Sequence, residues 1–173
     1  MITKINTNIS EKTNKRIINL LYDVNTWCFG YDNFLSKNLH KPNSGFIYKS
    51  YTAHPEANYF PHDCLNTYAT FIMDTVDQNC FLNFKKLRRI YWNWYSPGAS
   101  MKFHQDDDED NTYSIIYNLH TNDGGTEFKY NDKLDFYKSN ESEAFVFPSK
   151  LYHRGVAPSE NLNRFVLNIK VEI

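Results

Sequence analysis

The chain has 173 residues, of which 41% are hydrophobic and 17% aromatic, and its net charge at pH 7 is −1. This length suits a single hydrophobic core, and this composition excludes a disordered or low-complexity chain. The near-neutral charge provides no global positive field, so nucleic acid is not an expected partner. The N-terminal residues lack the apolar run of a signal peptide, and no stretch approaches the length of a membrane span. We therefore expect a cytoplasmic protein without a membrane partner.

The first half of the chain predicts two helices separated by a loop. Between Ser10 and Gly30 apolar residues recur at spacings of three and four, which places them on one face of a helix. Ser10 can cap this helix and Gly30 can end it. The segment 31–61 is broken by proline and glycine and is predicted to be mostly loop, with one strand near residues 46–51. A second amphipathic helix is predicted over residues 63–76.

After residue 80 the sequence changes to short β-branched or aromatic runs separated by turn residues. The predicted strands cover residues 87–95, 101–106, 113–119, 126–130, 144–147, 151–156 and 164–173. That much strand at close spacing favours a mainly β fold, a sandwich or jelly roll, with the two helices covering one sheet. We expect one domain over residues 1–173, with helical support in 1–80 and the jelly-roll core in 84–173.

Two patterns in the β-rich half supply side chains that can bind a metal. Residues two apart in a strand point to the same face, so His104 and Asp106 can converge on one point. A lone His-x-Asp arises by chance in about one of every few such sequences, but His153, after the strand at 144–147, can add a second imidazole. Two imidazoles and one carboxylate form the facial triad that suits iron(II) and leaves coordination positions open.

Arg164 opens the last predicted strand and shares a face with Val166 and Asn168. If the alternate, apolar row packs on the helices, this arginine points into the interior. A buried arginine is rare without a partner, and the natural partner is a carboxylate held by two parallel hydrogen bonds. Arg154 directly follows His153 and alternates to the opposite face, so Arg164 is the preferred carboxylate-binding residue.

These residues together describe a site for 2-oxoglutarate, which could chelate iron(II) at one end and meet the arginine at the other. The segment 95–106, a tyrosine, a Pro-Gly turn and His-x-Asp, resembles the Fe(II)/2-oxoglutarate dioxygenase superfamily, in particular its prolyl 4-hydroxylase-like branch. Residues 115–119 with 124–128 resemble the Gly-Gly strand pair of that branch. Residues 147–153, followed by Arg164-Phe-Val, match its closing metal ligand and oxoglutarate strand. The resemblance covers residues 87–173.

The resemblance implies a double-stranded β-helix core and an oxygenase that uses iron(II), 2-oxoglutarate and O2, with ascorbate as a reductant. It implies that the iron ligands are His104, Asp106 and His153 and that Arg164 binds oxoglutarate. Many hydroxylases of the branch use lysine at that last position, so this chain matches the arginine subset. A tyrosine that is often present in the strand after the Asp ligand falls near Tyr117 or Asn118, and its register stays open.

A second resemblance concerns Asn93-Trp-Tyr95, which is similar to the Asn-x-Tyr that precedes His-x-Asp in AlkB-like nucleic-acid demethylases. Asn93 and Tyr95 would share a strand face, so both could hydrogen-bond the oxoglutarate carboxylates, although Tyr95 could equally be a core aromatic. The Gly-Gly hairpin and the near-neutral charge favour the hydroxylase branch. The first expectation is hydroxylation of a prolyl residue in a peptide or protein. A small-molecule substrate, a nucleic-acid demethylase and a non-oxygenase metal protein of cupin type are the alternatives.

Three segments around this site have predicted roles. The segment 31–61 is expected to form a lid or groove wall, with Tyr51, Tyr59 and Phe60 as substrate contacts. The acidic run 107–110 is predicted to be a solvated loop, with a role in substrate binding left open. The basic residues Lys85, Lys86, Arg88 and Arg89 are predicted to lie on a solvated strand edge or loop.

Overall fold

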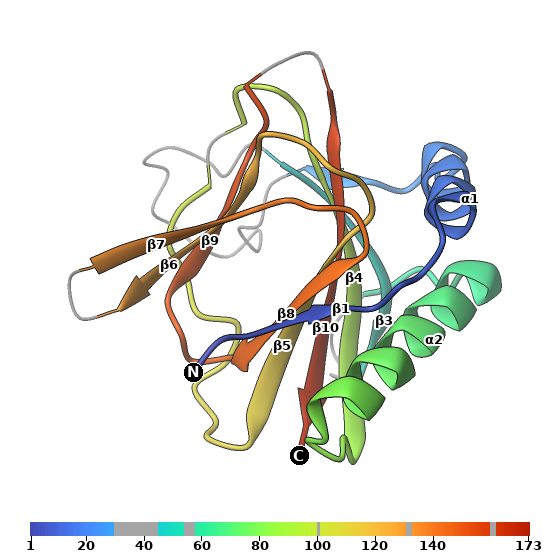
Figure 1. Ribbon diagram of the computed structural model, residues 1–173. Helices are drawn as coiled ribbons and strands as arrows, with labels where there is room; N and C mark the ends of the chain where they lie inside the picture. The colour runs from blue at the N-terminus through green and yellow to red at the C-terminus, as the bar shows by residue number, and fades with distance from the viewer. Residues whose placement is uncertain (30–44, 54–57, 100, 131–132, 160–161) are drawn as a thin grey trace.

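The computed structural model describes residues 1–29, 45–53, 58–99, 101–130, 133–159 and 162–173 (Figure 1). Its helices are α1 (Glu11–Tyr22) and α2 (Asp63–Cys80). Its strands are β1 (Thr3–Asn6), β2 (Cys28–Phe29), β3 (Phe46–Thr52), β4 (Lys86–Tyr95), β5 (Thr112–Asn118), β6 (Gly125–Tyr130), β7 (Lys133–Lys138), β8 (Glu143–Pro148), β9 (His153–Val156) and β10 (Arg164–Glu172).

Helix α1 begins where the sequence predicts, because the Ser10 side chain accepts a hydrogen bond from the Thr13 amide. The predicted end at Gly30 is wrong: the helix stops at Tyr22, and Gly30 lies outside the described residues. Val24 and Trp27 follow the helix but still pack against the same hydrophobic core. Their helix-like spacing therefore reflects a shared core and not a continuing helix.

Helix α2 confirms the second predicted helix and extends it to Cys80. The side chain of His62 accepts a hydrogen bond from the Leu65 amide at 3.3 Å and so caps the first turn. The helix ends at Phe81, which adopts a left-handed conformation with φ 56°. The backbone amide of Phe81 bonds to the Asp77 carbonyl, which satisfies one of the otherwise unpaired carbonyls at this end.

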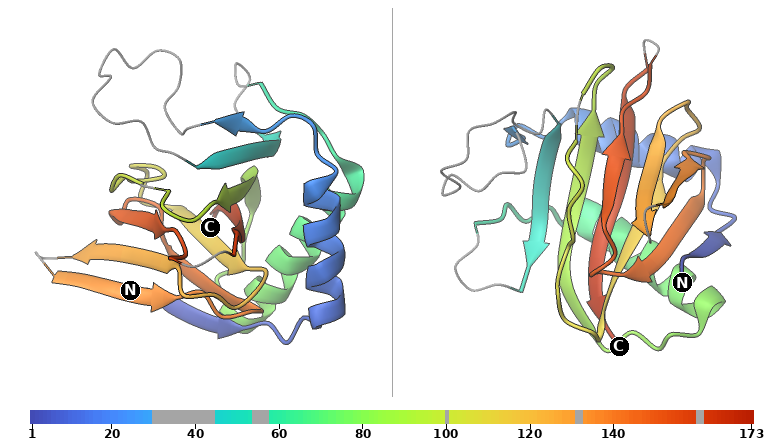
Figure 2. Two further views of the ribbon diagram at one scale, coloured as in Figure 1. Left: turned by 90° about the horizontal axis from the view of Figure 1, so that it is seen from above. Right: turned by 90° about the vertical axis from the view of Figure 1, so that its left-hand side faces the viewer.

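The strands form two antiparallel sheets, as the predicted jelly roll requires. The larger has the order β1-β8-β5-β10-β4-β3-β2, and the smaller has the order β7-β6-β9. Both helices lie on one side of the seven-stranded sheet and the three-stranded sheet lies on the other (Figures 1 and 2). The fold is therefore mainly β, a double-stranded β-helix supported by two N-terminal helices.

Strand β10 separates two hydrophobic layers because its side chains alternate between its faces. Phe165, Leu167 and Ile169 pack with the helices, whose fully buried residues include Ile17, Leu21, Leu65 and Ile72. On the opposite face Val166 packs between the sheets with Ile116, Phe128, Phe145 and Phe147. Each fully buried side chain of this size contributes about 1.5–3 kcal/mol. The apolar outer row thus leaves Arg164 and Asn168 facing the interior, as predicted.

One predicted strand is absent and three strands were not predicted. Residues 101–106 form no strand: only His104 makes an isolated bridge, to His153. This segment follows Gly98, whose φ of +77° turns the chain, and leads into the acidic run. The missed strands are β1, β2 and β7. Strand β7 is almost wholly exposed, so it lacks the alternation of apolar and polar residues that would indicate a strand.

The predicted lid lies partly outside the described residues, which omit 30–44 and 54–57. Within the described part, the predicted strand near 46–51 is confirmed as β3. Phe60 is held against this strand, because its amide donates to the Lys49 carbonyl and its carbonyl accepts from the Tyr48 hydroxyl. Tyr59 and Phe60 are 42% exposed. No helix in the described ranges is long and apolar enough to cross a membrane.

Candidate metal centre

His104, Asp106 and His153 meet at one end of the space between the sheets. Their candidate ligand atoms all lie within 4.8 Å of one another. Nε2 of His104 is 3.8 Å from one carboxylate oxygen of Asp106, and Nε2 of His153 is 3.6 Å from the other. The predicted convergence is therefore observed, but it arises from backbone pairing of His104 with His153 and not from a regular strand.

Both imidazole rings are oriented by backbone carbonyls. Nδ1 of His104 lies 3.1 Å from the Lys102 carbonyl oxygen, and Nδ1 of His153 lies 2.9 Å from the Leu151 carbonyl oxygen. Because a carbonyl can only accept, Nδ1 carries the proton in each ring. This leaves the lone pair of each Nε2 directed to the shared point, as in metal sites where a second partner fixes the histidine tautomer.

The electrostatics favour the protonation states that bind metal. Burial by itself would raise the pKa of Asp106, whose side chain is 3% exposed, but nearby positive charge outweighs this effect. Arg89 and the two histidines, with a hydrogen bond from Ser114, hold the pKa of Asp106 well below its usual range. Burial lowers the pKa of His153 against the opposing effect of Asp106. The site therefore presents an ionised carboxylate and a neutral imidazole.

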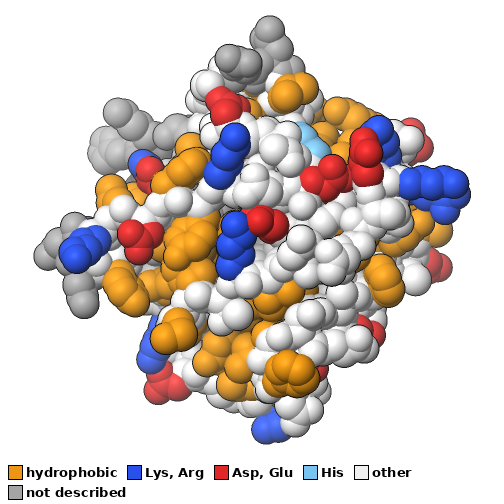
Figure 3. All heavy atoms as spheres, in the orientation of Figure 1, with side chains coloured by type: hydrophobic (Ala, Val, Ile, Leu, Met, Phe, Trp, Pro, Cys, Tyr) orange, Lys and Arg blue, Asp and Glu red, His pale blue; other side chains and the backbone are white. Residues whose placement is uncertain are grey.

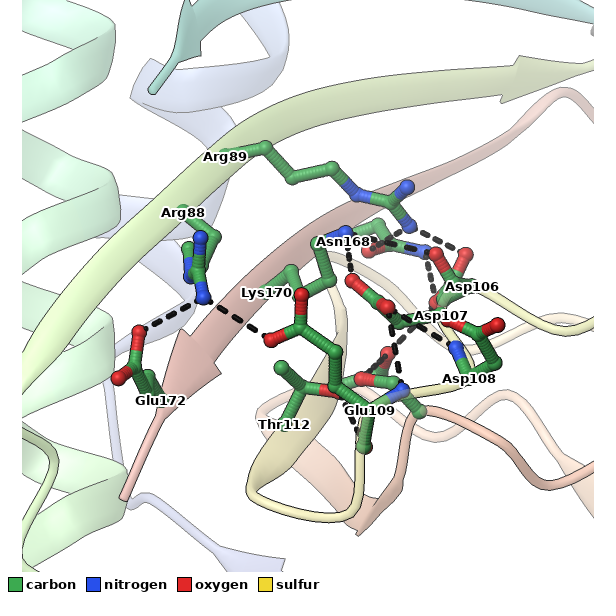
Figure 4. A network of polar contacts seen from close by, with 12 residues as sticks. Arg88, Arg89, Asp106, Asp107, Asp108, Glu109, Thr112, Asn168, Lys170 and Glu172 are labelled. Carbon is green, nitrogen blue, oxygen red and sulfur yellow. Dashed lines mark hydrogen bonds and ion pairs between the residues drawn. The ribbon is translucent and has the colours of Figure 1, made fainter. Parts of the chain in front are cut away.

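Three side chains on the inner face of the large sheet contact the Asp106 carboxylate, and Figure 4 shows two of them, Arg89 and Asn168. Arg89 donates to one oxygen, and Ser114 donates to the other at 2.6 Å. Asn168 lies 3.5 Å from that second oxygen. Sequence reasoning missed Arg89, although a signal existed: from Tyr95, every second residue of β4 back to Arg89 lies on one face.

The acidic run after Asp106 is a largely exposed loop, as predicted, because Asp108, Glu109 and Asp110 are exposed and Asp107 is half-buried. Lys170 pairs with Asp107, and Arg88 pairs with Glu109 at 3.0 Å. Arg88 also pairs with Glu172 on β10 at 2.9 Å (Figure 4). Exposed pairs of this kind contribute about 0–1 kcal/mol each, so their main consequence is to fix the position of the loop.

A pocket between the sheets joins the metal-binding residues to Arg164. Its lining residues are Asn93, Tyr95, His104, Ile116, Thr126, His153, Gly155, Arg164, Val166 and Asn168. They come from β4, β5, β6, β9 and β10 and from the loop before Asp106. A ligand here can therefore contact the metal-binding side chains and the arginine at the same time.

The Arg164 side chain is fully buried. One nitrogen lies 3.2 Å from the Thr126 hydroxyl and 3.4 Å from the Asn118 side-chain oxygen. The ring centre of Tyr95 lies 5.1 Å from its central carbon, within the range of a cation–π contact. An anionic ligand in the pocket would thus face a fixed positive charge. Sequence reasoning did not name Thr126, which follows the Gly-Gly pair.

The pairing register of β5 with β10 decides which of Tyr117 and Asn118 points to the pocket. Asn118 lies opposite Val166 and points to the interior, whereas Tyr117 points to the helices and donates its hydroxyl to Asn14 at 2.7 Å. The register that the sequence left open is therefore resolved in favour of Asn118. Asn93 is 2% exposed and lines the pocket.

Tyr95 and Arg154 lie on different sides of the small sheet. Tyr95 is 5% exposed, and its ring covers Gly155 so closely that a Cβ there would lie 2.7 Å from the ring. Arg154 donates to Glu127 at 2.7 Å and does not line the pocket. The preference for Arg164 over Arg154 therefore agrees with the geometry.

Neither a family model nor a curated protein matches this sequence, whereas its fold has many similar solved structures. A 2OG-Fe(II) oxygenase-family oxidoreductase from Burkholderia pseudomallei has a TM-score of 0.73 at 10% identity, covering 99% of this chain and 84% of that one. A prolyl hydroxylase from Trichoplax adhaerens, in complex with a peptide fragment of the hypoxia inducible factor oxygen degradation domain, has a TM-score of 0.70 at 14% identity, covering 99% and 83%. HygX from Streptomyces hygroscopicus, with nickel, 2-oxoglutarate and hygromycin B bound, has a TM-score of 0.68 at 8% identity, covering 99% and 82%.

These likenesses extend over almost the whole chain and include the helices as well as both sheets. At 14% identity and below they concern the fold and not the substrate. With its two antiparallel sheets and a His-Asp-His cluster between them, this chain has the fold of the Fe(II)/2-oxoglutarate-dependent oxygenases, prolyl hydroxylases among them.

Proposed function

We propose that this protein is an Fe(II)- and 2-oxoglutarate-dependent oxygenase with His104, Asp106 and His153 as its iron ligands. The observation that carries the proposal is that this cluster and the buried Arg164 line one pocket. Two imidazole nitrogens and one carboxylate oxygen form the facial triad that suits iron(II). The neutral His153 and the ionised Asp106 are the forms that bind a metal.

The roles of the chain in this reaction are binding and orientation. Iron(II) and 2-oxoglutarate, when bound, supply with O2 the oxidising power to hydroxylate an unactivated C–H bond. Arg164 binds the far carboxylate of 2-oxoglutarate, and Thr126 and Asn118 orient its guanidinium. Asn93 and Tyr95 contact the cofactor from β4. The buried pocket excludes water from the reacting groups.

For the substrate we propose a prolyl residue in a peptide or protein. The support is the sequence resemblance to the prolyl 4-hydroxylase-like branch, together with the shared fold of a prolyl hydroxylase that binds a peptide fragment. A small-molecule substrate is the second candidate, because HygX has this fold with hygromycin B bound. The cytoplasmic location and the use of ascorbate stay predictions from the sequence.

Nucleic acid is a poor candidate substrate. Arg88 and Arg89 pair with Glu109, Glu172 and Asp106, so acidic groups of the chain itself neutralise the two arginines of the basic cluster. On the face drawn in Figure 3, basic and acidic side chains are interspersed and form no basic patch. Because affinity for a polyanion scales with the number of phosphates neutralised, we expect weak and unspecific binding to DNA, measurable by fluorescence anisotropy.

An anaerobic titration tests the proposal. Fe(II) and 2-oxoglutarate added together should produce the visible metal-to-ligand charge-transfer band, and His153→Ala should remove it. Peptides and metabolites are then screened by mass spectrometry for the gain of one oxygen atom, with succinate release measured in parallel. Absence of both the band and succinate release in the wild-type protein would exclude the oxygenase assignment. Succinate release stimulated only by methylated oligonucleotides would replace the prolyl assignment with demethylation.

A further inference from the structure

One edge of β9 is open next to the metal-binding histidine. Strand β9 pairs with β6 on one side, and on the other side His153 exchanges two hydrogen bonds of 2.9 Å with His104. Backbone groups of an antiparallel strand point alternately to its two sides. The N–H and C=O of Gly155 therefore point to the same side as those of His153. Within the described ranges no hydrogen bond joins these two groups to the rest of the chain.

The edge is open because the chain before His104 leaves the strand register. A continued antiparallel pairing would place Lys102 opposite Gly155. Instead the Lys102 carbonyl turns to Nδ1 of His104, and the bridge is isolated. A cleft of about 330 Å³ separates the two segments. The residues that line it are Gly98, Ala99, Met101, Arg154, Gly155, Val156, Ala157, Pro158 and Ser159.

This cleft adjoins the pocket of the metal centre. Gly155 lines both, and it follows His153 by two residues, which is a distance of about 7 Å along a strand. A chain paired with Gly155 would thus lie one strand repeat from a metal-binding side chain. Since residues that face each other across two strands share a sheet face, the partner of Gly155 would direct its side chain to the interior.

We propose that the cleft binds the substrate as an extended peptide that adds a strand to β9 and exchanges backbone hydrogen bonds with Gly155. This inference rests on the proposed oxygenase function and concerns its substrate class. A donor and an acceptor on one residue match the N–H and C=O of one residue of an extended chain, as in other cases of strand addition. A compact small molecule does not in general carry a donor and an acceptor with the spacing of these backbone groups.

The lining of the cleft agrees with a peptide of small or apolar side chains. Ala99, Met101, Val156 and Ala157 provide apolar walls. Among the described lining residues only Arg154 is charged, and it is already bonded to Glu127 and stacks on Phe103. Because proline lacks an N–H, the peptide residue that pairs with Gly155 is not proline. Because side chains alternate between the two faces of an extended chain, the hydroxylated prolyl residue, which must also face the interior, stands two residues from it in sequence.

Isotope labelling can observe this contact directly, because Arg154-Gly155 is the only Arg-Gly pair in the chain. Protein labelled with ¹³C-carbonyl arginine and ¹⁵N-glycine should give a single signal in an HNCO spectrum, from the Gly155 amide. Zn(II) replaces Fe(II), 2-oxoglutarate is present, and the probe is the best proline-containing peptide from the oxygen-gain screen. The peptide should shift this signal and slow exchange of the amide with solvent about tenfold.

Variants of the same peptide, each with one N-methylated backbone amide, test which peptide amide bonds to Gly155. Methylation of the amide that pairs with Gly155 should weaken binding about tenfold, whereas methylation of its neighbours should have less effect. On the protein side, Ala99→Trp fills the cleft and should raise KM for the peptide about tenfold, with oxoglutarate affinity within about twofold of wild type. The control Gln78→Trp, at an exposed position on α2, should leave KM unchanged.

The outcomes separate this inference from the function on which it rests. Peptide hydroxylation with an unmoved Gly155 signal would overturn the strand addition and leave the oxygenase function intact. Succinate release that no peptide stimulates but a metabolite does would overturn it in favour of a small-molecule substrate. Without a charge-transfer band or any succinate release, the oxygenase function itself fails.

Discussion

Replacing Arg164 with alanine should chiefly weaken binding of 2-oxoglutarate. The guanidinium is fully buried and contacts Thr126, Asn118 and the ring of Tyr95. Leaving the far carboxylate of the ligand without its partner in such a site costs about 3–5 kcal/mol. This corresponds to a fall in affinity of about 150-fold to several thousand-fold. Arg164→Lys should recover part of this loss, because lysine keeps the charge but lacks the planar fork.

The assay is an anaerobic titration of 2-oxoglutarate that follows the charge-transfer band, with metal affinity measured separately by calorimetry. Metal affinity should change little, because the hydrogen bonds of Arg164 that the structure describes go to Thr126 and Asn118 and not to metal-binding side chains. The Asn118 oxygen still accepts a hydrogen bond from Ser139 at 2.9 Å, so the pocket should keep its shape. Arg154→Ala is the control, since Arg154 faces Glu127 outside the pocket. Unchanged oxoglutarate affinity in Arg164→Ala would refute the assignment of this arginine.

Further substitutions test the metal centre and the support of the sheet. His153→Ala should abolish succinate release and leave the circular dichroism spectrum intact; release at the wild-type rate would contradict the metal assignment. Arg89→Met should weaken Co(II) binding about 10–100-fold, because Asp106 loses the donor that orients it; tighter binding would show that the lost positive charge matters more. Asn14→Ala should lower the free energy of unfolding by about 1–3 kcal/mol in urea titrations, since Asn14 is buried and bonds to the Tyr117 hydroxyl; an unchanged midpoint would contradict this estimate.

Local patterns in the sequence were sufficient for most helices and strands and for the direction of Arg164. Ser10 caps α1 through its own side chain, and alternation along β10 separates Arg164 from Phe165, because both effects act between residues close in sequence. The same alternation placed Asn93 and Tyr95 on one face of β4. These predictions needed no knowledge of how the strands pair.

Long-range pairing decided the rest. His104 meets His153, 49 residues later in the sequence, through a backbone bridge, so the metal cluster forms without the predicted strand. Asn118 faces the interior because β5 pairs with β10 in one register, and a shift by one residue would have placed Tyr117 there. Arg89 reaches Asp106 because β4, paired with β10 and β3 in the large sheet, lies beside the loop that carries Asp106.

The open edge at Gly155 also separates what local sequence patterns predict from what strand pairing decides. The sequence predicts strands over residues 101–106 and 151–156, and a strand at each could in principle have paired with the other. In the tertiary structure the turn at Gly98 and the contact of Lys102 with His104 hold the first segment away from β9. The backbone bridge between His104 and His153, which no local pattern encodes, therefore decided where β9 is paired beside the metal centre.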